Sequence, residues 1–220
     1  MEFFFGLFTQ TRTSVNTGFL ERPITVGLIA ALLTGQWTQC VGVGIFFELL
    51  WLDLFPAGTY VPPQRILSTM LVCCVLSVLS LTWPSLIVIS ILCALPTASL
   101  GTFLEKRLRL VQSENHTRLV DWAEQSPAVS FPASMIWTSL GKKVVVESGL
   151  FLVLAVLVTT FTATLQSVFP AAQPPWDVRW PHLWSMALIG AILSVRIRKA
   201  YHILLAGVLL GILVVLALTS

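Results

Sequence analysis

One carboxylate in an apolar run has the clearest chemical potential in this sequence. Glu48 lies in the segment GVGIFFELLWL, where it is the one ionisable residue. An ionisable group at membrane depth is costly and usually marks a substrate or ion pathway. A carboxylate can also accept hydrogen bonds from two adjacent sugar hydroxyls, and charge-assisted bonds of this kind are strong. Glu48 is therefore the leading candidate for a ligand-binding side chain.

Other side chains close to Glu48 in the sequence could complete such a site. Trp51 follows by three positions, hence on the same helix face, and its indole could stack on the apolar face of a sugar ring. Asp53 could belong to the site or could solvate a helix end. Gln36 and Gln39 interrupt an apolar run, and they could hydrogen-bond a polyol or simply form a polar turn between helices.

The backbone that follows Glu48 is broken repeatedly by glycine and proline. Pro56 and Gly58 come first, and Pro62 and Pro63 come shortly after. Irregular backbone at membrane depth persists only where it is buried in protein or lines a polar cavity. We expect Gly58 and Pro63 to shape backbone that presents carbonyls and amides to a ligand, with Gln64 at the exit.

Two arginines offer structural explanations for Glu48. The carboxylate could pair with Arg22 or Arg65, or it could cap the broken helix that follows. Arg22 precedes Pro23, and proline suits the first position of a helix. Arg22 is therefore either a topology anchor at a helix start or an ion-pair partner of Glu48.

The composition is that of an integral membrane protein. The chain has 220 residues, 56% of them hydrophobic and 10% charged, with mean hydropathy +0.87, whereas soluble domains carry about 25% charged residues. A net charge of +3 does not suggest nucleic-acid binding. The four cysteines lie in apolar segments, which favours buried thiols over a disulfide or a metal site. We expect no cofactor.

No residue pattern in the sequence indicates an enzyme. His116, His182 and His202 have no neighbouring cysteine, aspartate or serine in a nucleophile arrangement. No phosphate-binding loop of the P-loop type is present, so ATP-driven transport by this chain alone is not expected. The start of the chain lacks the basic region and cleavage site of a signal peptide and resembles an interfacial segment.

Hydropathy predicts an all-α, polytopic membrane protein with about six to eight membrane segments in a single domain, 1–220. A spanning helix needs about 20 mostly apolar residues. The segments that meet or approach this length are 66–81, 84–104, 144–169, 181–195 and 200–218. The region 23–55 is interrupted at 35–39, so two short or re-entrant helices fit it better than two plain spans.

Basic residues predict the orientation of these segments. The hydrophilic stretch 105–143 carries six lysines and arginines, and a second basic cluster follows the segment 181–195. The positive-inside rule places both clusters, including the 105–143 loop, in the cytoplasm. Trp176, Trp180 and Trp184 then lie near the outer connection, as an interfacial aromatic belt would.

Small residues recur at helical spacing as Gly27, Ala31 and Gly35. Such a stripe lets two helix backbones approach closely. It could serve internal packing, or it could form a subunit interface, because a chain of this size could hardly enclose a sugar pathway alone.

The segment 18–64 resembles a block of the IIC membrane subunit of the mannose/fructose/sorbose family of the bacterial phosphoenolpyruvate-dependent sugar phosphotransferase system (PTS). The matching motifs are Arg22-Pro23, Gly35-Gln36, Glu48-Leu49-Leu50-Trp51-Leu52, Pro56-Ala57-Gly58 and Pro62-Pro63-Gln64. The block covers about a fifth of the chain and its spacings run without a gap. Where the family has aspartate after Gly35 and after Pro63, this chain has Gln36 and Gln64, which could alter sugar preference or weaken transport.

The resemblance implies a permease that is not an enzyme by itself. A IIC subunit forms the pathway with a second membrane subunit, IID, in an oligomeric complex of the bacterial cytoplasmic membrane. Cytoplasmic IIA and IIB proteins carry the phosphoryl group, and IIB passes it to the hexose as it emerges. Two alternatives remain open: a sugar facilitator uncoupled from phosphorylation, and a non-transporting scaffold or sensor derived from the family.

Overall fold

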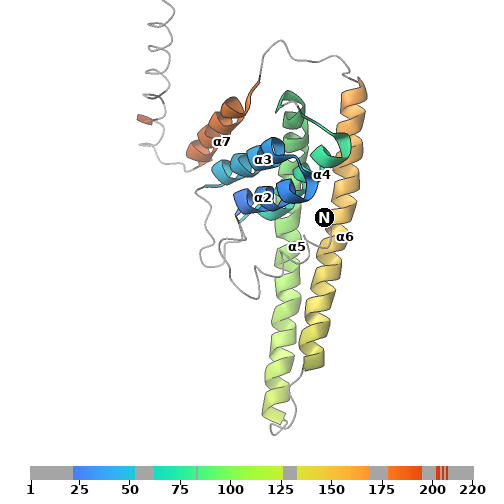
Figure 1. The fold of residues 1–220 in the computed structure, drawn as a ribbon. Helices are drawn as coiled ribbons and strands as arrows, with labels where there is room; N and C mark the ends of the chain where they lie inside the picture. The colour runs from blue at the N-terminus through green and yellow to red at the C-terminus, as the bar shows by residue number, and fades with distance from the viewer. Residues whose placement is uncertain are drawn as a thin grey trace, which may run out of the picture.

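The computed structural model describes residues 22–52, 62–82, 84–125, 133–168 and 178–194, together with His202, Ile203, Leu205 and Gly207. These residues form six helices and no strand: α2 (Pro23–Thr34), α3 (Trp37–Leu50), α4 (Arg65–Leu79), α5 (Pro84–Gln125), α6 (Ala133–Val168) and α7 (Trp180–Ser194) (Figure 1). The predicted all-α class is confirmed. The predicted segment 200–218 lies almost entirely outside the described residues.

The first two helices form a short antiparallel hairpin. Proline at the start of α2 has a backbone angle suited to a helix N-terminus. Gly35 ends α2 in the left-handed region, with φ 74°, and its N–H donates to Ala31 O at 2.8 Å. With 12 and 14 residues, the helices are about 18 and 21 Å long, shorter than the roughly 30 Å hydrocarbon core. The predicted pair of short helices is therefore found.

Glycines bring the backbones of α2 and α3 into direct contact. A Cβ atom on Gly27 would lie 2.6 Å from Cys40 O and 3.1 Å from Gly44 Cα. A Cβ atom on Gly44 would lie 2.9 Å from Pro23 O. Neither position can hold a side chain without moving the helices apart. Of the two interpretations of the small-residue stripe, internal packing is the one observed at Gly27.

Helices α5 and α6 are long enough to cross a membrane and project beyond it. Their apolar parts, Leu86–Leu110 and Gly141–Val168, have the length and hydropathy of membrane spans. The whole of α5 has 42 residues and measures about 63 Å. The hydrophilic stretch 105–143, expected as a loop, is helical over 105–125 and 133–143. In Figure 1 these ends extend away from the other helices, whereas α2 and α3 run across the direction of α5 and α6.

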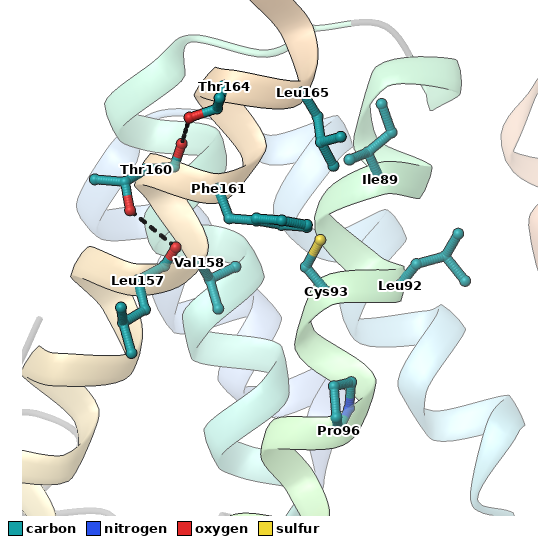
Figure 2. A pocket seen from close by; sticks show the side chains of 10 residues that line it. All are labelled: Ile89, Leu92, Cys93, Pro96, Leu157, Val158, Thr160, Phe161, Thr164 and Leu165. Carbon is teal, nitrogen blue, oxygen red and sulfur yellow. Dashed lines mark hydrogen bonds between the residues drawn. The ribbon is translucent and has the colours of Figure 1, made fainter. Parts of the chain in front are cut away.

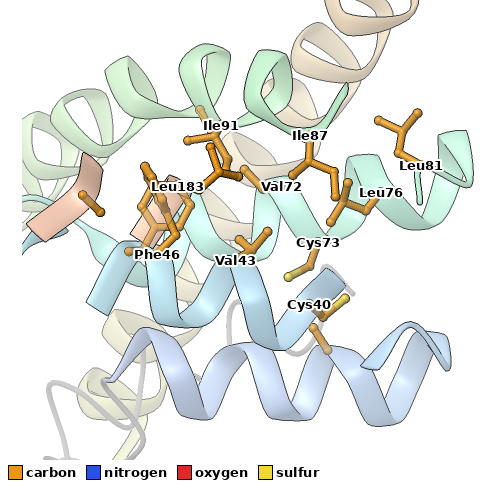
Figure 3. Packing of buried hydrophobic residues seen from close by; sticks show 14 of the residues in the cluster. Cys40, Val43, Phe46, Val72, Cys73, Leu76, Leu81, Ile87, Ile91 and Leu183 are labelled. Carbon is orange, nitrogen blue, oxygen red and sulfur yellow. The ribbon is translucent and has the colours of Figure 1, made fainter. Parts of the chain in front are cut away.

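Two apolar clusters hold the bundle together. The larger joins α2, α3, α4, α5 and α7 and includes Val43, Val72, Ile87 and Leu183 (Figure 3). Cys40 and Cys73 are buried within it. The smaller cluster joins α2, α4 and α6 and includes Val26, Ile66 and Phe151. Because lipid tails are as apolar as these side chains, close packing rather than water exclusion stabilises both clusters in a membrane.

Helix α7 packs against α3 through two tryptophans. Trp184 donates its indole N–H to Gly42 O at 3.0 Å, and the Trp180 ring occupies the space that a Cβ on Gly42 would need. The bounds of α7 agree with the predicted segment 181–195. The prediction of an interfacial belt overlooked this packing role, because a tryptophan N–H can bond to a neighbouring helix as well as to interfacial water.

The glycine contact yields a first prediction. Gly27→Ala should destabilise the protein by about 1–3 kcal/mol, because the added methyl group meets backbone that cannot rotate away. Gly149→Ala in α6 is the matched control, since a Cβ atom there would meet nothing within 4 Å and alanine favours helix by about 1 kcal/mol. Thermal unfolding in detergent, followed by tryptophan fluorescence, measures both. Equal midpoints for the two variants would contradict the prediction.

Candidate functional site

Glu48 lies at the open end of the α2–α3 hairpin, against the start of α2. Its Oε1 accepts a hydrogen bond from Arg22 Nη1 at 3.0 Å, and Oε2 lies 3.5 Å from the backbone N–H of Ile24. The Glu48 side chain is 15% exposed and that of Arg22 is 56% exposed. Of the structural explanations for Glu48, pairing with Arg22 is observed, whereas a cap on the segment after Leu52 would lie outside the described residues.

The start of α2 needs an acceptor of this kind. The first N–H groups of a helix have no partner within it, and the helix dipole makes this end positive. Arg22, at the N-cap, supplies no side-chain cap. Glu48, from the last turn of α3, supplies a negative charge there instead. A carboxylate has about four acceptor positions, so Glu48 retains capacity for the hydroxyl groups of a ligand.

Trp51 belongs to the apolar core. Helix α3 ends at Leu50, and the Trp51 ring stacks on Phe47 with a centroid separation of 5.1 Å and an interplanar angle of 14°. It is 8% exposed. One face of its indole is therefore already covered by Phe47, and its predicted stacking on a sugar remains untested.

The segment before α4 is attached to α5. Gln64 is 2% exposed, its backbone N–H donates to Ala98 O at 3.2 Å, and its side chain lies against Gly101, where a Cβ atom would overlap Oε1. Thr102 Oγ1 donates to Pro62 O at 3.2 Å. Pro63 is half-buried. Gln64 is therefore buried inside the protein, and its predicted place at the exit of a ligand pathway remains a prediction.

The structure separates Gln36 from Glu48. Gln36 lies in the turn between α2 and α3, where its Nε2 donates to Leu76 O at 3.4 Å. Glu48 follows it by 12 positions along α3, about 18 Å at 1.5 Å per residue. A single hexose cannot touch both, so the predicted grouping of these two residues is not what the structure shows.

The remaining predicted site residues are Arg65, Asp53 and Gly58. Arg65 opens α4 and is half-buried. Asp53 and Gly58 lie outside the described residues, so their predicted roles remain predictions.

Sequence reasoning missed three buried charged residues. Glu105 in α5 is 4% exposed and accepts from Arg109 Nη2 at 2.7 Å. In α6, Lys143 Nζ lies 3.8 Å from Glu147 Oε1, and the two side chains are 4% and 3% exposed. The positive-inside rule uses Lys143 only as a topology marker, but it is buried against a carboxylate. The available signal was the spacing of four residues at the start of an apolar run.

An open groove of about 840 Å³ lies between α5 and α6. Most of its lining is apolar, with Ile89, Leu92 and Phe161 among the side chains that face it (Figure 2). The hydroxyl of Thr160 donates to carbonyls of α6, and so does that of Thr164. A sugar site needs several convergent polar groups, so this groove does not resemble one. Within the described residues, no cluster of three metal-ligating side chains occurs.

Comparison with known proteins gives one finding about family. The family model described as the PTS system sorbose-specific IIC component matches residues 2–195. No curated protein and no solved structure gives a significant match. The matched region contains all six described helices and every candidate side chain above.

The Arg22–Glu48 pair yields a second prediction. Arg22→Met should lower the free energy of unfolding by about 1–3 kcal/mol, because the mostly buried carboxylate loses its charged partner. Lys106→Met, at an exposed position of α5, is the control and should have little effect. The double variant Arg22→Met/Glu48→Gln should recover part of the loss. Thermal unfolding in detergent tests this, and an Arg22→Met midpoint equal to that of the control would refute it.

Proposed function

Because the chain belongs to the family of sorbose-specific IIC components of the PTS, we propose that it binds a hexose and carries it across the bacterial cytoplasmic membrane. Family membership makes the chain a membrane subunit of a PTS sugar permease. Two helices of membrane-spanning length and the composition of the chain agree with this. The proposal adds three points to family membership: that the sugar is a hexose, that a partner protein phosphorylates it, and that it crosses the membrane through this chain.

The position of Glu48 is the observation that best supports sugar binding. It is a carboxylate on a helix of 14 residues, shorter than the membrane core, and it lies at the N-terminus of α2, beside Arg22. The arginine and the positive end of the α2 dipole both attract a carboxylate. A charged acceptor held in one orientation can bond two neighbouring sugar hydroxyls, which a neutral amide does less strongly.

The proposed mechanism divides the work among several chains. Sugar hydroxyls bind at Glu48, and the α2–α3 hairpin and its neighbours change their packing so that the site opens to the cytoplasm. A IID membrane subunit completes the pathway. A phosphorylated IIB protein, charged by IIA, then transfers its phosphoryl group to the hexose. No described residue of this chain is assigned a catalytic role.

The direct test is phosphoenolpyruvate-dependent phosphorylation of labelled hexoses by membranes that contain this chain and its IID partner, with IIA and IIB added. Activity that disappears when this chain is omitted supports the permease role and identifies the sugar. Uptake that persists without a phosphoryl donor would indicate a facilitator instead. If the intact complex shows neither phosphorylation nor uptake, that result would favour a scaffold or sensor.

A third prediction concerns affinity. Glu48→Gln should weaken hexose binding roughly five- to tenfold, because a hydrogen bond to a charged group contributes about 1–1.5 kcal/mol more than a neutral one. Membrane insertion should be unchanged. Gln36→Leu, at the far end of α3, is the geometric control and should leave affinity within about twofold. Binding of labelled hexose to membranes measures both. Normal affinity in the Glu48 variant would contradict the assignment.

A further inference from the structure

We propose that an anionic phospholipid binds along the seam between α5 and α6. Its phosphate lies at Arg107 and Lys142, and an acyl chain runs from there into the apolar groove that the two helices form. The residues concerned lie outside the segment 18–64 and take no part in the proposed sugar site. The inference therefore does not depend on transport of a hexose.

The groove has the chemistry of a site for a hydrocarbon chain. It is open, has a volume of about 840 Å³ and is lined by side chains such as Leu92, Leu157 and Phe161 (Figure 2). The hydroxyls of Thr160 and Thr164 donate to main-chain carbonyls of α6, so they do not need a polar ligand. An apolar occupant is therefore the one that the lining fits.

An exposed apolar stripe continues from the groove along α5 to a cation. Pro96 lines the groove, and the residues that follow it at steps of three or four, on the same helix face, are Leu100, Phe103 and Arg107. Leu100 and Phe103 are 52% and 59% exposed. The guanidinium of Arg107 lies over the Phe103 ring, 5.2 Å from its centroid. The stripe thus ends in a positive charge.

Helix α6 carries a second stripe of the same kind. Leu157 lines the groove, and the residues that precede it at steps of three or four, all of them exposed, are Val153, Gly149, Val146 and Lys142. The two helices run antiparallel (Figure 1). Both stripes therefore lead from one groove to the same end of the helix pair, and each ends in a cation.

The length of the stripes agrees with the depth of one lipid leaflet. Arg107 follows Pro96 by 11 positions, about 16 Å along the helix. Half of the hydrocarbon core is about 15 Å thick, and the apolar span Leu86–Leu110 is centred close to Pro96. A phosphate at Arg107 thus lies at the membrane surface, with the end of its acyl chain at the groove. Lys142 lies somewhat farther out, and its long side chain can extend toward the headgroup.

The distribution of charge favours an anionic lipid over a soluble partner. The segments 104–110 and 141–150 together carry five lysines and arginines against two glutamates. Each glutamate already lies within 4 Å of a cation of its own helix. Farther from the membrane, residues 111–125 carry three acidic residues and one arginine. Positive charge is therefore concentrated at the membrane surface, where clusters of lysine and arginine attract anionic headgroups.

The experiment titrates lipid into the purified chain in a neutral detergent and counts bound lipid by native mass spectrometry. The probes are dioleoylphosphatidylglycerol, its zwitterionic counterpart dioleoylphosphatidylcholine, and glycerol phosphate, which has no acyl chain. Arg107→Gln/Lys142→Gln removes both cations, and Leu92→Trp fills the groove. Lys106→Gln is the matched control, because Lys106 is exposed beside Arg107 but on a different face of α5.

The unaltered chain should bind phosphatidylglycerol about thirtyfold more tightly than phosphatidylcholine, as two surface cations predict. Arg107→Gln/Lys142→Gln should lose this preference, whereas Lys106→Gln should keep most of it. Leu92→Trp should weaken the binding of both lipids and leave their ratio unchanged. Glycerol phosphate should not compete. Because the two substituted cations are exposed, the double variant should unfold in lipid-free detergent at the same temperature as the unaltered chain.

Three results would overturn the inference. The first is equal affinity for the two lipids, or a preference that survives the loss of both cations. The second is competition by glycerol phosphate at the concentrations at which lipid binds, which would indicate a site for small anions. The third is release of the bound lipid when the IID partner is added, which would show that a partner helix occupies the groove.

Discussion

The structure depends first on the close contact between the backbones of α2 and α3. Gly27 and Gly44 bring the two helices within van der Waals distance of each other's main chain. At this separation, Glu48 on one helix can reach the first turn of the other and its arginine. In a bilayer, where apolar burial alone gives little driving force, such packing and hydrogen bonding are what hold helices together. The geometry of the candidate site therefore depends on these two glycines.

The second general feature is that acidic side chains are paired with cationic ones. Within the described residues, Glu48, Glu105 and Glu147 each lie within 4 Å of a cationic side chain. Each of these carboxylates thus has a cationic partner nearby, as the cost of burying an unpaired charge would lead one to expect. The groove between α5 and α6 is lined mostly by apolar side chains.

Much of the fold could be read from hydropathy, whereas the site could be read only in part. Apolar runs bounded by proline or glycine predicted α4 and α7 within about two residues, and the interruption at 35–39 predicted the hairpin. Glu48 was found because it is isolated in an apolar run. Lys143 and Glu147 were missed because they stand where a hydrophilic stretch meets a span, so the sequence alone does not tell whether they face water or protein. Gln36 was grouped with Glu48 because closeness in sequence does not reveal which end of a hairpin a residue occupies.

Pro96 is a point at which α5 can bend. Proline removes a main-chain hydrogen bond from a helix interior and leaves it easier to bend, and here it lies in the apolar part of α5. Nearby, the Ser68 hydroxyl of α4 donates to Ala94 O at 3.1 Å and connects the two helices, while the Thr97 hydroxyl donates to the same carbonyl at 2.6 Å from within α5. From Pro96 to Gln125 the helix is unbroken and about 44 Å long. A bend of about ten degrees at Pro96 would therefore move the far tip by about 8 Å, so α5 would act as a lever that converts a small repacking beside α4 into a large displacement outside the membrane.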